Sequence, residues 1–257
     1  MDYENILLDI DSEFARLTLN RPEKRNALSL DHMQEITHAL RVVGESEAIG
    51  LIVDANGPVF SAGHDFSDMA GSDIGFMRKL IWTCTEMMRT MTEIPQPIVA
   101  KVHALATAAG CQLVATADLA VAADTAGFAT PGGKGGWFCH TPMVAVARSV
   151  GRKRAFEMGA TGDIIDAETA CAWGLINYSV APESLESATV SLLARATRGS
   201  SYSKGVGKQT FYRQIDLTTD QAYSLASETM AGTSQSSDAQ EGMAAFLEKR
   251  KPKWTNS

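Results

Sequence analysis

Hydrophobic and polar positions follow two different periods along this chain of 257 residues. Between Phe14 and Leu19, apolar residues alternate with Arg16 and Thr18, which predicts a half-buried strand. Apolar runs predict further strands at residues 6–10, 50–53, 98–102 and 119–123. Helical spacing predicts helices at residues 30–43, with Ser29 as N-cap, and at residues 76–91. A small-residue segment at 104–110 then leads into a short helix, and this alternation of strands and helices indicates an α/β protein.

The pattern becomes helical after Pro142. Apolar spacing predicts helices at residues 183–197, 221–230 and 239–250. The Gly199-Ser200-Ser201 sequence is the best candidate for a boundary. We therefore expect a core at residues 1–198 and a C-terminal helical region at residues 199–257.

Composition narrows the function. A net charge of -7 argues against nucleic acid as a partner, but leaves room for a small molecule that carries phosphate. No apolar run approaches the ~18 residues of a membrane span. The acidic start MDYENILLDI does not resemble a secretory signal. Four cysteines without metal-ligand spacing (Cys84, Cys111, Cys139 and Cys171) predict reduced thiols, no metal site and a cytoplasmic location.

Two segments of small residues, Phe60–Asp65 and Ala108–Gln112, stand at predicted strand-to-helix junctions. Small residues allow a ligand to approach the backbone, and the amides at a helix start have no intrahelical acceptor. Two such amides directed at one carbonyl oxygen would form an oxyanion hole. Each segment alone also fits a tight turn where a helix packs on a strand.

Taken together with Asn26-Ala27-Leu28 and Phe128-Ala129-Thr130-Pro131, these segments resemble the crotonase (enoyl-CoA hydratase/isomerase) superfamily. Within it they look most like the subgroup of enoyl-CoA hydratase domain-containing protein 3. The resemblance covers nearly the whole chain. It implies an α/β crotonase fold, a spiral of repeated ββα units with a C-terminal helical region that forms homotrimers or homohexamers.

The resemblance also implies a substrate, an acyl-CoA thioester, with CoA as part of the substrate and no permanently bound cofactor. By position, the thioester carbonyl would lie between the backbone amides of His64 and Ala109, which would stabilise an enolate-like anion. The expected reaction is that of an enoyl-CoA hydratase or isomerase. The alternatives are another isomerase, a decarboxylase or a thioesterase that uses the same amides, or a CoA-ester-binding subunit without catalysis.

Four further residues are implied as CoA contacts. Arg25 would lie beside the adenine or the phosphates, and the backbone of Ala62 would accept a hydrogen bond from the adenine. Lys249 and Lys251 would approach CoA from the same or a neighbouring subunit. The alternative for these two lysines is a solvated, charged chain end.

The chain departs from the family at both catalytic glutamates, which are replaced by Gln112 and Gly132. An amide cannot exchange a proton near neutral pH, and glycine has no side chain. We expect Gly132 to leave room in a flexible wall of the site. His140, or a water held by Gln112, would transfer protons instead, because histidine titrates near neutrality. The alternative for His140 is a packing or helix-capping role.

The other three histidines are not predicted to take part in the chemistry. His32 and His38 are expected on an exposed helix face, and His103, after a buried strand, is expected to be structural.

Overall fold

The computed structural model describes residues 3–10 and 13–257. Asp11 and Ser12, which belong to the predicted turn between the first two strands, lie outside the described residues. The main sheet contains, in spatial order, β1 (Ile6–Asp9), β2 (Phe14–Leu19), β3 (Gly50–Ala55), β4 (Ile98–Val102), β6 (Leu119–Ala123) and β9 (Tyr178–Val180). β1 is antiparallel to β2, and the remaining pairs are parallel. A second sheet joins β5 (Ala106–Thr107), β7 (Gly127–Ala129) and β8 (Ile165–Asp166).

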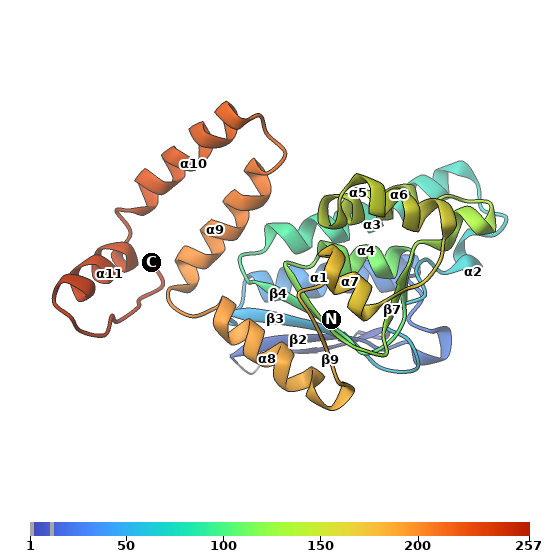
Figure 1. Ribbon diagram of the computed structural model, residues 1–257, viewed down its shortest axis with the longest axis horizontal. Helices are drawn as coiled ribbons and strands as arrows, with labels where there is room; N and C mark the ends of the chain where they lie inside the picture. Colours follow the sequence, from blue (N-terminus) through green and yellow to red (C-terminus); the bar gives the residue numbers. More distant parts are fainter. Residues whose placement is uncertain (1–2, 11–12) are drawn as a thin grey trace.

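Helices cover both faces of the main sheet and then extend away from it (Figure 1). The helices of the core are α1 (Leu30–Gly44), α2 (Phe66–Met69), α3 (Ile74–Glu93), α4 (Ala109–Thr116), α5 (His140–Val150), α6 (Arg152–Thr161), α7 (Ala167–Trp173) and α8 (Leu185–Ala196). Three short 3-10 turns are η1 (Pro22–Lys24), η2 (Pro131–Gly135) and η3 (Pro182–Ser184). The projecting helices are α9 (Ser201–Gln214), α10 (Thr219–Thr233) and α11 (Ser237–Leu247).

The alternation of side chains along the strands produces two apolar layers. On one face, Leu51 of β3 joins the large cluster that α1, α3 and α4 cover. On the other face, Ile52 packs with Val99, Val121 and Leu193 of α8. Because β3, β4 and β6 are buried on both faces, their sequences are nearly continuous apolar runs, which is why the pattern located them.

The first projecting helix, α9, is fastened to the core by a buried ion pair. Lys208 contacts Asp118 at 2.8 Å and donates a hydrogen bond to the carbonyl of Gln96 at 2.8 Å. A Cβ on Gly205 would lie 2.7 Å from the Pro95 side chain, so glycine permits this close approach. The sequence pattern did not predict α9 as a helix. The division at residue 199 falls between α8 and α9 and stays a prediction.

The expectation that two histidines of α1 are exposed is wrong. His32 is fully buried, and its Nδ1 lies 3.1 Å from the carbonyl oxygen of Ala27. His38 is half-buried and forms a 2.8 Å hydrogen bond with the Tyr3 hydroxyl. The first turns of α1 are covered by the loop that precedes them, which a helical pattern does not reveal. His103 is structural as expected, since its Nε2 lies 2.8 Å from the carbonyl oxygen of Gly57.

No helix among the described residues is long and apolar enough to cross a membrane.

Candidate active site

The two small-residue segments predicted to form an oxyanion hole lie side by side. The N–H of Thr107 donates to the carbonyl of Ser61 at 2.9 Å. A Cβ on Gly110 would lie 2.5 Å from that same oxygen, and a Cβ on Gly63 would lie 3.2 Å from the backbone nitrogen of Ala109. Side chains at either glycine would separate the segments, so glycine is required at both positions.

Neither predicted donor amide has a hydrogen-bond partner in the part of the chain that the structure describes. Leu28 donates its N–H to the Gly63 carbonyl at 2.7 Å and accepts from the Asp65 N–H at 3.2 Å, on either side of His64. Among the described residues, the N–H of His64 itself has no hydrogen-bond partner. Ala109 is the first residue of α4, where an N–H has no intrahelical acceptor. The structure therefore brings two unpaired backbone donors to one place.

Backbone strain marks the second donor. Ala108, which directly precedes α4, has a φ of 50° and a ψ of -118°. A non-glycine residue in this region costs about 1–3 kcal/mol and persists only where surrounding contacts impose it. Here the contact is a strand-like one, because the Ala108 N–H donates to the Ala129 carbonyl at 2.9 Å.

The imidazole of His64 is packed away from solvent. Within the described part of the chain, neither ring nitrogen has a hydrogen-bond partner, and both are buried. Burial lowers the pKa of this histidine, because the charged form loses its hydration. Burial therefore disfavours the charged form of the ring.

Gln112 and Thr130 supply polar side chains beside the donors. Gln112 lies on the first turn of α4, 5% exposed, and its Oε1 has no partner among residues 3–10 and 13–257. Thr130 is fully buried, directly after the β7 residue that pairs with Thr107, and its Oγ1 is likewise unpartnered in the described chain. In the sequence, Thr130 stands out only as part of the Phe128-Ala129-Thr130-Pro131 motif. The available signal was a polar residue where a buried strand ends.

The expectation that Gly132 leaves empty room is wrong. A Cβ there would lie 2.2 Å from the Trp137 carbonyl oxygen and 2.8 Å from Cys139 Sγ. The loop is held in this shape by hydrogen bonds from the Trp137 N–H to the Gly132 carbonyl (2.9 Å) and from the Gly132 N–H to Cys139 Sγ (3.3 Å). Atoms of the same loop fill the space beside Gly132. Hydrogen bonds hold this loop in one shape, in contrast to the flexible wall that was expected.

His140 is exposed at the first position of α5. Its ring packs against Phe138, with ring centroids 5.3 Å apart. No contact joins it to Gln112 or to the two donor amides within the described chain. Its part in proton transfer stays a prediction, and the packing alternative describes its position in this structure.

The predicted CoA contacts fall into two places. Arg25 and Ala62 are both exposed and are neighbours, because the Ala62 N–H donates to the Arg25 carbonyl at 3.0 Å. Lys249 and Lys251 follow α11, at the opposite end of the molecule from α2 (Figure 1). Within one chain these lysines do not reach the donor amides, so their contribution from a neighbouring subunit is what stays predicted.

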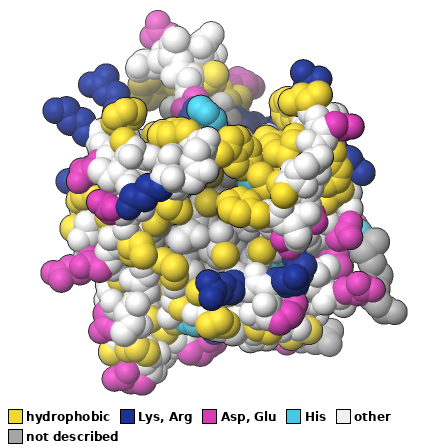
Figure 2. Space-filling model, turned by 90° about the vertical axis from the view of Figure 1, so that its right-hand side faces the viewer, with side chains coloured by type: hydrophobic (Ala, Val, Ile, Leu, Met, Phe, Trp, Pro, Cys, Tyr) yellow, Lys and Arg dark blue, Asp and Glu magenta, His cyan; other side chains and the backbone are white. Residues whose placement is uncertain are grey.

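The end of the molecule that carries α2 has a mixed surface. Figure 2 shows hydrophobic side chains gathered on the upper part of this face, with basic side chains along its upper edges and at two places below its centre. Large exposed apolar residues of these elements include Phe66, Ile74 and Trp137. The combination suits a ligand with an apolar part and an anionic part.

Comparison with known proteins agrees with this architecture over almost the full length. A model of the family described as enoyl-CoA hydratase/isomerase matches residues 9–257. The chain belongs to this family. It is 41% identical over 246 residues to the mitochondrial enoyl-CoA hydratase domain-containing protein 3 of Danio rerio, which covers 94% of this chain and 84% of that protein.

Solved structures of this family superpose closely. An enoyl-CoA hydratase of Mycobacterium smegmatis has a TM-score of 0.95 at 40% identity and covers 98% of this chain and 99% of that one. The human enoyl-CoA hydratase domain-containing protein 3 has a TM-score of 0.94 at 38% identity and covers 98% and 100%. The predicted crotonase fold and the likeness to this subgroup are confirmed.

One expectation about this family member is contradicted. The cytoplasmic location was expected from the cysteines and the acidic first residues. The relatives of Danio rerio, Rattus norvegicus and Homo sapiens are all named as mitochondrial proteins. Reduced thiols and an acidic start do not distinguish two compartments that both keep cysteines reduced, so the inference was not specific enough.

Proposed function

We propose that this protein processes acyl-CoA thioesters by binding the thioester carbonyl between the N–H groups of His64 and Ala109. Loss of the α-proton would place negative charge on the carbonyl oxygen, and two fixed donors stabilise that charge more than they stabilise the neutral thioester. The observation that carries the proposal is the pair of unpaired amides held together by the close approach of Gly63 to Ala109.

Hydration by two glutamates is not part of the proposal. Gln112 cannot exchange a proton near pH 7, and the backbone at position 132 is covered by its own loop. Protons would instead be transferred by His140 or by a water that the Gln112 amide orients. An isomerase, a decarboxylase or a thioesterase acting on a CoA ester needs the same donors and is distinguished by its product.

The remaining contacts concern CoA and the assembly. Arg25 and Ala62 are neighbours on the surface and would hold the adenine and phosphates, and Lys249 and Lys251 would reach CoA from a second subunit. A homotrimer or homohexamer would supply that second subunit. The acyl chain would lie against the exposed apolar residues near α2.

The test is a panel of CoA thioesters in D2O, with crotonyl-CoA, malonyl-CoA and a saturated acyl-CoA. Mass spectrometry follows product formation and incorporation of deuterium at the α-carbon, which reports the enolate even without net turnover. We expect exchange or turnover with at least one thioester. Binding without either would support the non-catalytic subunit instead, and no binding of any CoA ester would overturn both readings.

A proline substitution tests the donor itself. Ala109→Pro removes one N–H at the first position of a helix, and because its ring also restricts the strained Ala108 before it, thermal stability and Kd for the CoA ester are measured together with the rate. We expect roughly a 100- to 1,000-fold loss of rate. Thr219→Pro, at the first position of α10, is the matched control and should keep the wild-type rate. Equal rates for Ala109→Pro and Thr219→Pro would contradict the proposed role.

A further inference from the structure

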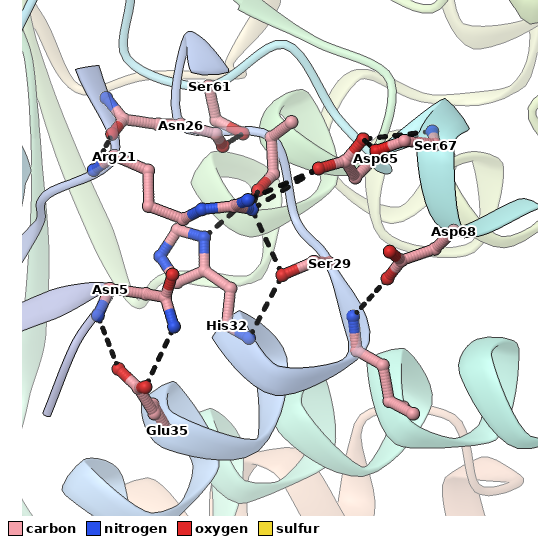
Figure 3. Close-up of polar contacts among 12 residues, drawn as sticks. Asn5, Arg21, Asn26, Ser29, His32, Glu35, Ser61, Asp65, Ser67 and Asp68 are labelled. Carbon is pink, nitrogen blue, oxygen red and sulfur yellow. Dashed lines mark hydrogen bonds and ion pairs between the residues drawn. The ribbon is translucent and has the colours of Figure 1, made fainter. Parts of the chain in front are cut away.

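Arg21 lies against the segment that carries the His64 donor, and its side chain is 16% exposed. Its Nη1 donates to the Ala27 carbonyl at 2.8 Å and to Ser29 Oγ at 3.0 Å. The same guanidinium contacts Asp65 Oδ2 at 3.4 Å, and Figure 3 shows it between Ser29 and Asp65. One side chain therefore joins two segments that are more than thirty residues apart in the sequence.

Those two segments hold the His64 peptide from both sides. Leu28 lies between Ala27 and Ser29, which Arg21 contacts. The N–H of Leu28 donates to the Gly63 carbonyl, and its carbonyl accepts from the Asp65 N–H. Because these two hydrogen bonds bracket His64, they set the direction of its free N–H. Arg21 reaches the bracket at both ends, through the backbone around Leu28 and through the carboxylate of Asp65.

The carboxylate at the second end is ionised. Burial alone would raise the pKa of Asp65, but hydrogen bonds from Ser67 and the charge of Arg21 outweigh burial and lower it. Asp65 also caps α2, because its Oδ1 accepts from the Ser67 N–H at 3.0 Å. A change at Arg21 is therefore transmitted to the start of α2 as well as to the Leu28 segment.

From these contacts we infer that Arg21 is a positioning residue for the His64 donor, an inference that rests on the proposed function above. Arg21 acts through Leu28 and Asp65 and is not placed to touch the substrate. Its planar guanidinium donates to three acceptors at once, which a lysine ammonium on a flexible stem does not reproduce. A donor displaced by ~1 Å can lower a rate about 100-fold. The contacts of the Arg21 guanidinium therefore affect the rate through the position of the His64 N–H.

The experiment measures carbonyl polarisation directly. The probe is the CoA thioester of 4-(dimethylamino)cinnamic acid, whose absorption band moves to longer wavelength as hydrogen bonds polarise its carbonyl. For Arg21→Met we expect a Kd within about threefold of wild type and about half the band shift or less. The band shift of Arg21→Lys should lie between those of Arg21→Met and the wild type. Arg41→Met removes an arginine of α1 from its exposed ion pair with Glu86 of α3 and should match wild type.

Each outcome supports or overturns the inference. A wild-type band shift in Arg21→Met overturns it, even if the variant melts at a lower temperature, since that would be a structural role alone. If Arg21→Met does not fold, Asp65→Asn replaces it and should reduce the shift while the probe still binds. A wild-type protein that binds the probe without any shift overturns the proposed function itself, and this result is recognisable without any variant.

Discussion

Gly132 provides the sharpest test of how this site differs from a two-glutamate hydratase. The perturbation is Gly132→Ala, which adds a Cβ 2.2 Å from the Trp137 carbonyl oxygen and 2.8 Å from Cys139 Sγ. The nearer atom belongs to the backbone, so the loop itself must move. Overpacking costs about 1–3 kcal/mol, and losing the hydrogen bond from the Trp137 N–H adds about 0.5–1.5 kcal/mol.

The sum is about 1.5–4.5 kcal/mol of unfolding free energy, which corresponds to a fall in Tm of about 3–18 °C for a chain of this size. The matched control is Gly135→Ala, in the same turn, where no atom lies within 4 Å of the new Cβ. Both variants lower the entropy of the unfolded chain equally, so their difference isolates the packing cost. We expect Gly135→Ala to change stability by less than about 0.5 kcal/mol.

Differential scanning fluorimetry and urea unfolding of the two variants make the measurement. If Gly132→Ala melts within about 2 °C of Gly135→Ala, the loop yields freely and the packing argument is refuted. The same contacts predict that Gly132→Glu does not create a hydratase, because its carboxylate cannot be placed without rebuilding the loop. Hydration of crotonyl-CoA by Gly132→Glu above the wild-type rate would contradict this reasoning.

Three further predictions concern burial and the chain end. His32 has a pKa of about 4 in the folded protein, whereas an unfolded histidine gains a proton near pH 6.5. The free energy of unfolding should therefore fall by about 3 kcal/mol as the pH drops from about 6.5 to about 4. His32→Asn should flatten that slope in urea titrations, and parallel slopes would refute the assignment. Lys208→Met leaves Asp118 buried and unpaired and should cost about 3–5 kcal/mol, partly recovered by adding Asp118→Asn; no recovery would argue against the pair. Replacing both Lys249 and Lys251 with alanine should weaken CoA binding about fivefold or more by calorimetry, whereas an unchanged Kd would mark a solvated end.

The strands were predictable because their signal is local. β4 and β6 have the bounds that the apolar runs indicated, since buried parallel strands are continuous and end at polar or proline residues, and β2 has the bounds that its alternation indicated. α9 was missed because Gly205 and Gly207 dilute its pattern. The reason for Gly205 is Pro95, a contact between distant parts of the chain that no local pattern contains.

The same distinction divides the site. The two small-residue segments were recognisable as a local signal at strand-to-helix junctions, whereas the assignment of His64 and Ala109 as donors came from the family resemblance and stays a prediction. Three features depend on contacts with residues elsewhere in the chain. They are the filled space at Gly132, the buried ring of His32 and the hydrogen bonds of the Arg21 guanidinium. A pattern says which positions lack bulk, but only the folded chain says whether that space is empty or occupied.

The donor pair formed by His64 and Ala109 has a consequence for how this site tolerates mutation. Both hydrogen atoms belong to peptide bonds, so any substitution other than proline that preserves the backbone path leaves them in place. Binding the anion and moving the proton are therefore separable properties, one encoded in chain geometry and the other in exchangeable side chains. If the two amides bind the thioester as proposed, the loss of both family carboxylates would leave that affinity in place, and the same donors would serve a different reaction.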